Sequence, residues 1–249
     1  MLQVMVNGCN GKMGRIVTQL VDKDESIILK CGVDKDNLGD LTCPVYTNLS
    51  QITEKPDVII DFSVPVATFN ILEYAKEKRV PVVIATTGFT EEEEKKISEY
   101  ANVIPIFKSA NMSFSINVFQ HLLKEFAPKF QNCDIEIVET HHNRKVDSPS
   151  GTATMLANTI NKALGEDYYI EYNRHEKNEK RNKKEIGISS IRGGNIVGEH
   201  SVIFFGESES FEIKHTSYSR NVFAEGAIKA AKFIAGKQKG LYNMDDLIK

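Results

Sequence analysis

The sequence lacks the features that mark membrane and secreted proteins. No apolar run approaches the ~20 residues that a transmembrane helix needs. The opening residues M-L-Q-V-M-V-N-G carry neither the positive charge nor the cleavage site of a secretory signal. The 4 cysteines show no C-x-x-C spacing, a pattern typical of reduced thiols rather than of a disulfide framework. Together these absences predict a cytoplasmic protein without a membrane segment.

A large excess of charge of either sign is also lacking. The formal net charge is −3, which argues against nucleic acid as the main partner. No internal repeat or low-complexity tract interrupts the chain, and 249 residues suffice for one large or two medium domains. With 41% hydrophobic and 26% charged residues, the composition is that of an ordinary globular protein.

A glycine-rich turn follows the first apolar segment. Residues 2–6 have the pattern of a short strand, and N-G-C-N-G-K-M-G follows, with glycines at positions 8, 11 and 14. Residues 15–22 then have a helical periodicity, so the order is that of a dinucleotide-binding βαβ unit. Cys9 stands where the common G-x-G-x-x-G form has its first glycine. The turn by itself therefore also fits a loop that binds no nucleotide.

The second apolar segment, 26–33, ends at an acid and a base side by side. Asp34 lies 20 positions after Gly14, where an acid accepts the ribose hydroxyls of NAD. Lys35 could pair with the 2′-phosphate of NADP, and Lys12 in the glycine turn could help. The pair predicts use of NADH or NADPH, although a solvated turn has the same composition.

Strands and helices continue to alternate down to residue 112. The pattern predicts strands at 57–61, 80–85 and 103–107, with helices at 65–78 and 91–100. Such alternation is typical of a parallel sheet, whose ligands lie at the carboxyl ends of the strands. The turns A-T-T-G and S-A-N-M-S lie there, and their small residues would let the backbone approach a nicotinamide. Taken alone, each turn is more simply explained by a purely structural role.

The most informative stretch is residues 139–154, E-T-H-H-N-R-K-V-D-S-P-S-G-T-A-T. It follows an alternating strand at 134–138 and leads into a predicted helix at 153–164, with Ser150 as a suitable N-cap. The backbone N–H groups of Gly151 and Thr152 would be free at that helix start to bind a carboxylate.

Proton-transfer groups stand beside this expected carboxylate site. His141 and His142 exchange protons near neutral pH, and Lys145 is a compact positive charge. A polar surface loop has a similar composition and remains the alternative for the loop alone. A zinc site is not expected, because adjacent histidines rarely reach one ion and no Cys or i,i+4 His partner is present.

The second half mixes helices with a β region. A helix is predicted at 115–130, and the charged run 174–185 is predicted as a mobile exposed loop, with a basic contact surface as the alternative. From residue 186, three apolar segments have the turn spacing of a β-meander. A final helix at 222–235 could return to the first domain.

These motifs together resemble one family. V-N-G-C-N-G-K-M-G, A-T-T-G-F, S-A-N-M-S and above all E-T-H-H-N-R-K-V-D-S-P-S-G-T-A look like 4-hydroxy-tetrahydrodipicolinate reductase, also called dihydrodipicolinate reductase. The resemblance covers essentially the whole chain, including R-G-G-N-I-V-G-E-H near its end. It implies NAD(P)H-dependent reduction of 4-hydroxy-tetrahydrodipicolinate to tetrahydrodipicolinate in the diaminopimelate route to lysine.

The resemblance also implies a role for each matching residue. His141 matches the general acid/base and Lys145 a cationic proton donor, while His142, Gly151 and Thr152 match the groups that hold the dicarboxylate substrate. The implied cofactor residues are Gly8, Cys9, Asn10, Gly11, Lys12 and Met13 at the pyrophosphate, Asp34 and Lys35 at the ribose and its phosphate, and Ala85, Thr86, Thr87, Ser109, Ala110, Asn111 and Met112 at the nicotinamide. No metal ligand is implied. Three departures bear on cofactor preference: Ala85 replaces a glycine, Met112 an aromatic residue and Asn10 a glycine.

The implied fold is α/β with two domains. Residues 1–112 and 222–249 would form a Rossmann dinucleotide-binding domain, and residues 113–221 an inserted α/β domain with a mixed sheet that binds substrate and forms a homotetramer. The segment 195–206 gives an independent reason to expect assembly, because it carries more apolar side chains than a sheet with one face in water needs.

The implied chemistry is hydride transfer to one carbon and proton transfer to its neighbour, with a closing motion joining the two domains. Two rival functions remain open at this point. A nucleotide sensor without catalysis would need the glycine turn but not His141 with Lys145. A dehydrogenase for another small acid would differ only in its substrate.

Overall fold

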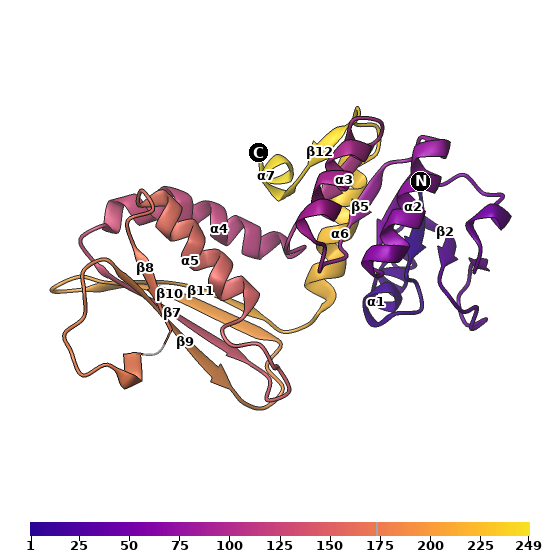
Figure 1. The fold of residues 1–249 in the computed structure, drawn as a ribbon. Helices are drawn as coiled ribbons and strands as arrows, with labels where there is room; N and C mark the ends of the chain where they lie inside the picture. The colour runs from indigo at the N-terminus through magenta and orange to yellow at the C-terminus, as the bar shows by residue number, and fades with distance from the viewer. Residues whose placement is uncertain (173) are drawn as a thin grey trace. The chain divides into compact units, whose positions relative to one another are not determined.

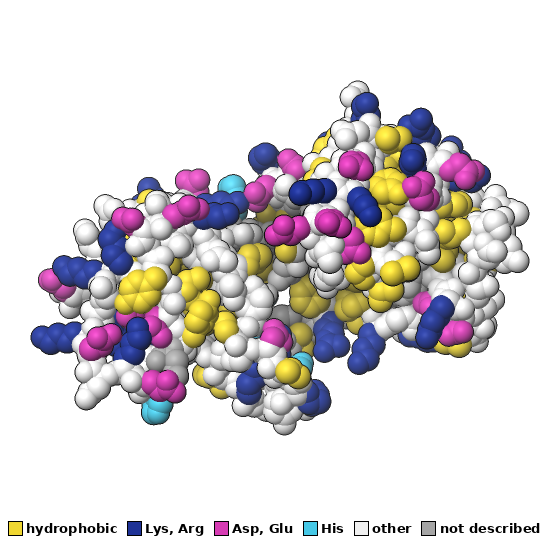
Figure 2. Space-filling view, in the orientation of Figure 1, with side chains coloured by type: hydrophobic (Ala, Val, Ile, Leu, Met, Phe, Trp, Pro, Cys, Tyr) yellow, Lys and Arg dark blue, Asp and Glu magenta, His cyan; other side chains and the backbone are white. Residues whose placement is uncertain are grey.

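The computed structural model describes residues 1–172 and 174–249 and divides into two compact units. Unit 1 comprises Met1–Phe114 and Asn221–Lys249, and unit 2 comprises Ser115–Arg220. Each unit has its own sheet. None of the helices in the described part of the chain has the length and hydropathy of a membrane span. On the face seen in Figure 2, side chains of both charges are interspersed, in keeping with the small net charge.

Unit 1 is built on a seven-stranded parallel sheet with the order β12-β6-β5-β4-β1-β2-β3. Its strands are β1 (Leu2–Asn7), β2 (Ile27–Val33), β3 (Val45–Tyr46), β4 (Val58–Asp61), β5 (Val82–Ile84), β6 (Pro105–Lys108) and β12 (Gly240–Tyr242). Its helices are α1 (Lys12–Val21), η1 (Leu49–Gln51), α2 (Pro65–Lys78), α3 (Glu91–Ala101), α6 (Asn221–Ile234) and α7 (Met244–Ile248). The predicted α/β fold with a parallel Rossmann-type sheet is confirmed.

Helices cover both faces of this sheet. Val17 of α1 and Ala227 of α6 belong to the core on one face, while Leu72 of α2 and Ile97 of α3 belong to the core on the other. Strand β4 is buried along its whole length, which explains its continuous apolar run. The final helix α6 packs against β4, β5 and β6, so the chain does return to its first half, as Figure 1 shows. The edge strand β12 was not predicted.

Unit 2 is built on a five-stranded mixed sheet with the order β11-β10-β7-β9-β8. Its strands are β7 (Asp134–His141), β8 (Tyr169–Glu171), β9 (Glu185–Arg192), β10 (Gly198–Phe205) and β11 (Ser210–Ser217). Its helices are α4 (Phe114–Phe126), η2 (Ala127–Phe130), α5 (Gly151–Ala163) and η3 (Arg174–Glu176). Helices α4 and α5 lie on one face of this sheet (Figure 1), where Leu123, Leu156, Val202 and Phe204 form the core.

The expected β-meander is wrong. β10 and β11 form a hairpin, but β7 lies between β9 and β10, parallel to β9 and antiparallel to β10. Turn spacing located the strands, but it carried no information about which strand each would pair with. The connection from β9 to β10 crosses the end of β7, where Gly193 N donates to His141 O and His142 N donates to Ile196 O. This crossing brings the β9–β10 loop over the histidines.

The charged run 174–185 is less exposed than expected. Arg174 donates to the buried Glu185, and Arg181 pairs with Glu136 and Glu185 and also donates to the carbonyl of Ile135. These ion pairs bind the run to the sheet, because the carboxylates of β7 and β9 face its arginines. The prediction of an exposed loop holds for most positions of the run but is wrong for Arg174 and Arg181, which are half-buried.

Candidate active site

The glycine turn between β1 and α1 is tight enough to require its glycines. Gly8 has φ +77°, and a Cβ there would lie 2.4 Å from the carbonyl oxygen of Phe62. A Cβ on Gly14 would lie 2.0 Å from the carbonyl oxygen of Gly8, so α1 packs directly on the turn. No side chain of residues 1–172 or 174–249 caps the start of α1 at Gly11. The first N–H groups of α1 therefore offer an anion site of the kind that binds a pyrophosphate.

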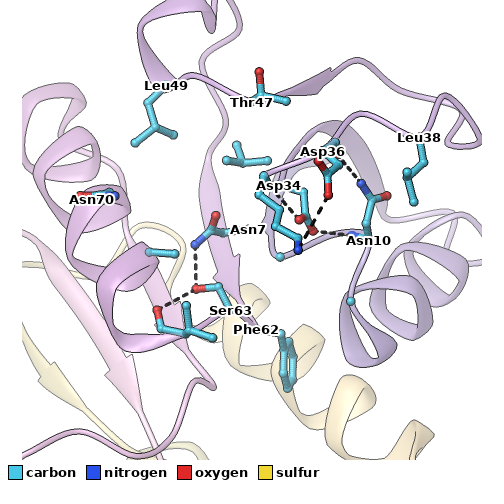
Figure 3. A pocket seen from close by; sticks show the side chains of 16 residues that line it. Asn7, Asn10, Asp34, Asp36, Leu38, Thr47, Leu49, Phe62, Ser63 and Asn70 are labelled. Atoms are coloured by element: carbon cyan, nitrogen blue, oxygen red, sulfur yellow. Dashed lines mark hydrogen bonds and ion pairs between the residues drawn. The ribbon is translucent and has the colours of Figure 1, made fainter.

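A cavity of about 730 Å³ opens beside this turn (Figure 3). The carboxylate of Asp34 accepts from the N–H of Asn10 and from the N–H of Lys35, both at 2.8 Å, and so joins β2 to the glycine turn. The Lys35 side chain is 88% exposed and makes a loose 3.9 Å pair with Asp36. An exposed, weakly paired lysine at this rim is free to meet a phosphate. Residues of the glycine turn and the end of β2, including Asp34 and Lys35, line this cavity, so they could hold part of a dinucleotide.

A second cavity of about 400 Å³ lies at the carboxyl ends of β4, β5 and β6. Its lining includes all of the predicted nicotinamide residues, namely Ala85, Thr86, Thr87, Ser109, Ala110, Asn111 and Met112, together with Met13, Phe62, Ser63 and Phe223. Phe62 and Ser63 line both cavities, so the two spaces adjoin along one edge of the sheet. Of the other predicted residues, Cys9 has its side chain buried in the core, and Lys12 is exposed at the start of α1.

A buried carboxylate that sequence reasoning missed organises this second cavity. Asp61 ends β4 and accepts from Asn7 Nδ2 at 2.7 Å, Ser63 Oγ at 2.5 Å, Thr68 Oγ1 at 2.6 Å and Thr86 Oγ1 at 2.9 Å. Burial raises the pKa of Asp61, against the lowering effect of these four hydrogen bonds. Ser63 and Thr86 line the cavity and donate to Asp61, so this buried carboxylate holds two of the lining side chains in place.

In unit 2, the strand β7 carries His141 on its buried face. Ile135, Ile137, Glu139 and His141 alternate toward the interior, so the last two stand next to each other on one side of the sheet. His141 Nδ1 lies 2.5 Å from Glu139 Oε2. Because a carboxylate at neutral pH can only accept, Nδ1 carries the proton, and Nε2 is the free nitrogen of the neutral ring.

Glu139 is held by donors on every side. Arg192 Nη1 donates to Oε2 at 2.8 Å and Nη2 donates to Oε1 at 2.7 Å, while the N–H of Ser150 donates to Oε1 at 3.1 Å. Burial acts to raise the pKa of Glu139, but hydrogen bonds from Arg192, Ser190, His141 and Ser150 outweigh it and lower the pKa to about 2. Glu139 is therefore an anion throughout the physiological pH range.

A second histidine packs against the first. The His200 ring lies edge-on to the His141 ring at 5.1 Å, and its Nε2 lies 3.0 Å from Ser150 Oγ, which also caps α5 by accepting from Ala153 N. Burial, followed by the charge of His141, lowers the pKa of His200 to about 4. A Cβ on Gly198 would lie 3.1 Å from His141 Nε2. Any larger residue at position 198 would therefore crowd the free nitrogen of His141.

The remaining predicted site residues surround this pair. Lys145 forms a 2.8 Å ion pair with Asp147, whose carbonyl accepts from Arg192 Nη2 at 2.7 Å. His142 has its ring Nδ1 buried without a hydrogen-bond partner among the described residues. Gly151 and Thr152 begin α5 directly after Ser150, as the expected helix start requires. Burial, above all, lowers the pKa of His141, against the raising effect of Glu139, so its ring is mainly neutral at pH 7.

Glu139, Arg192, Ser150 and His200 complete the site, and sequence reasoning assigned no site role to Glu139, Arg192 or His200. One signal was present: strand alternation from Ile135 places Glu139 and His141 on the buried face, where an unpaired charge is costly. Arg192 and His200 gave no such signal, because their pairing with Glu139 and Ser150 depends on the strand order.

The chain is similar to a set of known reductases over its whole length. Residues 2–112 match the family model described as dihydrodipicolinate reductase, N-terminus, and residues 115–248 match the one described as dihydrodipicolinate reductase, C-terminus. The 4-hydroxy-tetrahydrodipicolinate reductase of Caldanaerobacter subterraneus subsp. tengcongensis is 50% identical, covering 100% of this chain and 99% of its own. That of Clostridium novyi is 48% identical, with coverage of 100% and 99%.

Solved structures agree with these matches. A dipicolinate-bound dihydrodipicolinate reductase from Paenisporosarcina sp. TG-14 superposes with a TM-score of 0.82 at 28% identity, covering 98% of this chain and 97% of that one. A probable dehydrogenase from Thermotoga maritima superposes with a TM-score of 0.63 at 12% identity, covering 99% of this chain and 92% of that one, a likeness of fold alone.

Proposed function

The chain belongs to the dihydrodipicolinate reductase family, and we infer that it is the NAD(P)H-dependent 4-hydroxy-tetrahydrodipicolinate reductase of the diaminopimelate route to lysine. The product of this reaction is tetrahydrodipicolinate. The observation that carries the inference is whole-length similarity at about half identity to relatives of that name. The Rossmann-type unit 1 and the two cavities along its sheet support NADH or NADPH as the cofactor.

The residues of unit 1 suit this cofactor. The glycine turn and the free start of α1 would hold the pyrophosphate, Asp34 the adenosine ribose, and the small residues around the second cavity the nicotinamide. When bound, the nicotinamide supplies a hydride. Lys35, exposed at the rim of the first cavity, would contact the 2′-phosphate of NADPH without impeding NADH.

The residues of unit 2 suit proton delivery to a dicarboxylate. We assign His141 Nε2 as the atom that takes up a proton and passes it to the substrate, since Nδ1 is committed to Glu139. The Lys145 ammonium would stabilise negative charge as it develops. The N–H groups at Gly151 and Thr152 would hold substrate carboxylates, together with the buried Nδ1 of His142, which has no hydrogen-bond partner in the described part of the chain.

An assay of NADPH and NADH oxidation with enzymatically generated substrate tests this function. Loss of absorbance at a rate that depends on the substrate is the expected result. Oxidation that ignores this substrate but responds to another small acid would favour the rival dehydrogenase. Cofactor binding without any turnover would favour the sensor.

We further propose that the protein is a homotetramer assembled through the uncovered face of the five-stranded sheet. Val202 and Phe204 point into the core beneath α4 and α5, whereas Ile203 and Phe205 alternate to the other face, where Phe205 is 42% exposed. Arg181 pairs with Glu136 on this face, but α4 and α5 lie on the other one, and exposed apolar side chains on a sheet face without a helix layer mark an interface. The sequence pattern predicts assembly from the whole apolar segment 195–206, but only its outward-facing side chains are available for an interface.

Sedimentation at micromolar concentration tests the assembly. Phe205→Asp should split it, whereas Leu122→Asp, which charges an equally exposed apolar position (40%) on α4, should not. A wild-type mass near the 28.0 kDa of one chain would rule the assembly out. We also propose a cytoplasmic location, which the free thiols of Cys9, Cys31, Cys43 and Cys133 support.

A further inference from the structure

Glu139 accepts from the proton-transfer histidine and from an arginine at once. We propose that Glu139 is a positioning residue that fixes His141 in its Nδ1–H tautomer and stabilises the protonated form of the ring, and that Arg192 keeps Glu139 ionised for this purpose. The proposal rests on the proposed function, because it assigns Glu139 a role in proton transfer through His141.

The geometry allows only a carboxylate at this position. The donors that converge on Glu139 are His141 Nδ1–H, both terminal nitrogens of Arg192 and the N–H of Ser150, all within 2.5–3.1 Å. A carboxylate accepts from all of them through its two oxygens. A glutamine would have to point its own N–H₂ group at one of these donors. Whichever way the amide lies, at least one donor would lose its acceptor.

Replacing Glu139 by glutamine would also change the protonation of His141 Nε2. If the amide N–H₂ replaced Oε2, it would favour a His141 ring that accepts at Nδ1 and carries its proton on Nε2, the wrong tautomer for taking up a proton there. In either orientation the negative charge beside the ring would be gone. The charge and hydrogen bond of Glu139 are what oppose the burial of His141, so imidazolium would become rarer at any given pH.

Arg192 connects the surroundings of His141 to those of Lys145. It donates to both oxygens of Glu139 and, through Nη2, to the carbonyl of Asp147, whose carboxylate pairs with Lys145. One side chain from β9 therefore fixes the acceptor of His141 and the loop that carries Lys145. This link supplies a reason for the parallel pairing of β9 with β7, which places Arg192 opposite His141.

Glu139→Gln is the decisive variant, and the same strand offers a matched control. Glu136 is also paired with an arginine, Arg181, but it faces away from the histidines on the other side of β7. Glu136→Gln should therefore share the cost of losing an arginine-paired carboxylate without touching His141. Glu139→Asp serves as the conservative variant, since it restores the charge at a slightly longer distance and should recover part of the lost rate.

Two measurements decide between positioning and a merely structural role. In steady-state kinetics, Glu139→Gln should lower kcat by roughly 10- to 100-fold, with a much smaller change in KM, and should move the alkaline limb of the kcat/KM profile to lower pH. In nitrogen NMR of the imidazole rings, wild type and Glu136→Gln should show His141 protonated at Nδ1, and Glu139→Gln should show a mixed or reversed tautomer with a lower pKa.

The outcomes separate this proposal from the proposed function. If Glu139→Gln matches Glu136→Gln in its tautomer, pH profile and kcat, the positioning role is overturned while the reductase function stands. If the wild type does not reduce the substrate, the proposed function fails, and the NMR comparison alone decides whether Glu139 sets the state of His141. A circular-dichroism melt of each variant identifies any loss of rate that comes from unfolding.

Discussion

Each unit buries one carboxylate on the central strand of its sheet. The hydrogen-bond donors around the two carboxylates differ in charge, and the two pKa values are shifted in opposite directions. Asp61 on β4 and Glu139 on β7 are both 0% exposed. Asp61 is surrounded by neutral donors, three hydroxyls and an amide, and its pKa is raised by burial. Glu139 faces an arginine and a histidine, and its pKa is lowered to about 2 by hydrogen bonds that outweigh its burial.

The difference follows the task that each unit is proposed to perform. Neutral donors around Asp61 hold the ends of β1, β4 and β5 together, which shapes the cavity proposed for the nicotinamide and requires no fixed charge. The cationic donor beside Glu139 keeps a negative charge next to a histidine, which is useful only where a proton must be taken up. Equal burial therefore does not imply equal function, because the donor set decides the charge state.

We expect the largest effect, a loss of kcat, from substitutions beside Glu139 in unit 2. His141→Gln should lower kcat by roughly 10²-fold or more with little change in KM, because the proton-transfer atom is removed. Lys145→Ala should act in the same direction. NADPH binding, followed by fluorescence, should be unchanged in both, since unit 1 is intact. Near-normal kcat in both variants would remove this site and favour the nucleotide sensor.

The next largest effect, a loss of stability, is expected from removing the Asp61 carboxylate in unit 1. Asp61→Ala removes the common acceptor of Asn7, Ser63, Thr68 and Thr86, so we expect a loss of about 2 kcal/mol in the free energy of unfolding. Urea denaturation of the variant and wild type measures it. The KM for the dinucleotide should rise as well, because Ser63 and Thr86 line the cavity. A variant with unchanged stability and cofactor KM would show that the walls hold without Asp61.

These two networks also mark where sequence reasoning ended. Local patterns predicted α2 at Pro65–Lys78, where proline is suited to the first turn, and Ser150 as the cap of α5. The motifs led to residues that line both cavities and flank the histidines. The partners of the buried carboxylates were not predictable, because Asn7 is 54 residues from Asp61 and Arg192 is 53 from Glu139. Those pairings form only in the folded sheets, and in unit 2 the expected meander gave the wrong strand order.

A smaller effect concerns the rim of the first cavity. Lys35→Ala should weaken NADPH roughly tenfold and leave NADH almost unchanged, because a single exposed cation meets only the 2′-phosphate. Titration of the two cofactors into wild type and variant measures this. Lys30→Ala, which removes a lysine of β2 outside that cavity, is the control. Equal losses for both cofactors would show that Lys35 does not contact that phosphate.

The smallest effect, and the sharpest test of the comparison, is the dependence of stability on pH. The folded pKa of Asp61 lies above its ordinary value of 3.8, so its contribution to stability is fully present below that pH and is lost as pH rises through the folded pKa. The folded pKa of Glu139 lies near 2, below its ordinary 4.5, so its contribution is present above 4.5 and is lost as pH falls toward 2. As pH rises, the contribution of Asp61 to the free energy of unfolding therefore falls, while that of Glu139 rises.

Replacing one carboxylate at a time by its amide should separate the two contributions to the pH dependence of stability. Asp61→Asn retains an acceptor oxygen for Asn7, and its N–H₂ can donate to the hydroxyls of Thr68 and Thr86, so its deficit against wild type should stay within about 1 kcal/mol and shrink as pH rises above 4. Glu139→Gln should show its largest deficit above pH 4.5, and the deficit should shrink as pH falls. Urea midpoints between pH 3 and 8 measure both. Parallel curves for the two variants would mean that neutral and cationic donors leave these carboxylates in the same charge state.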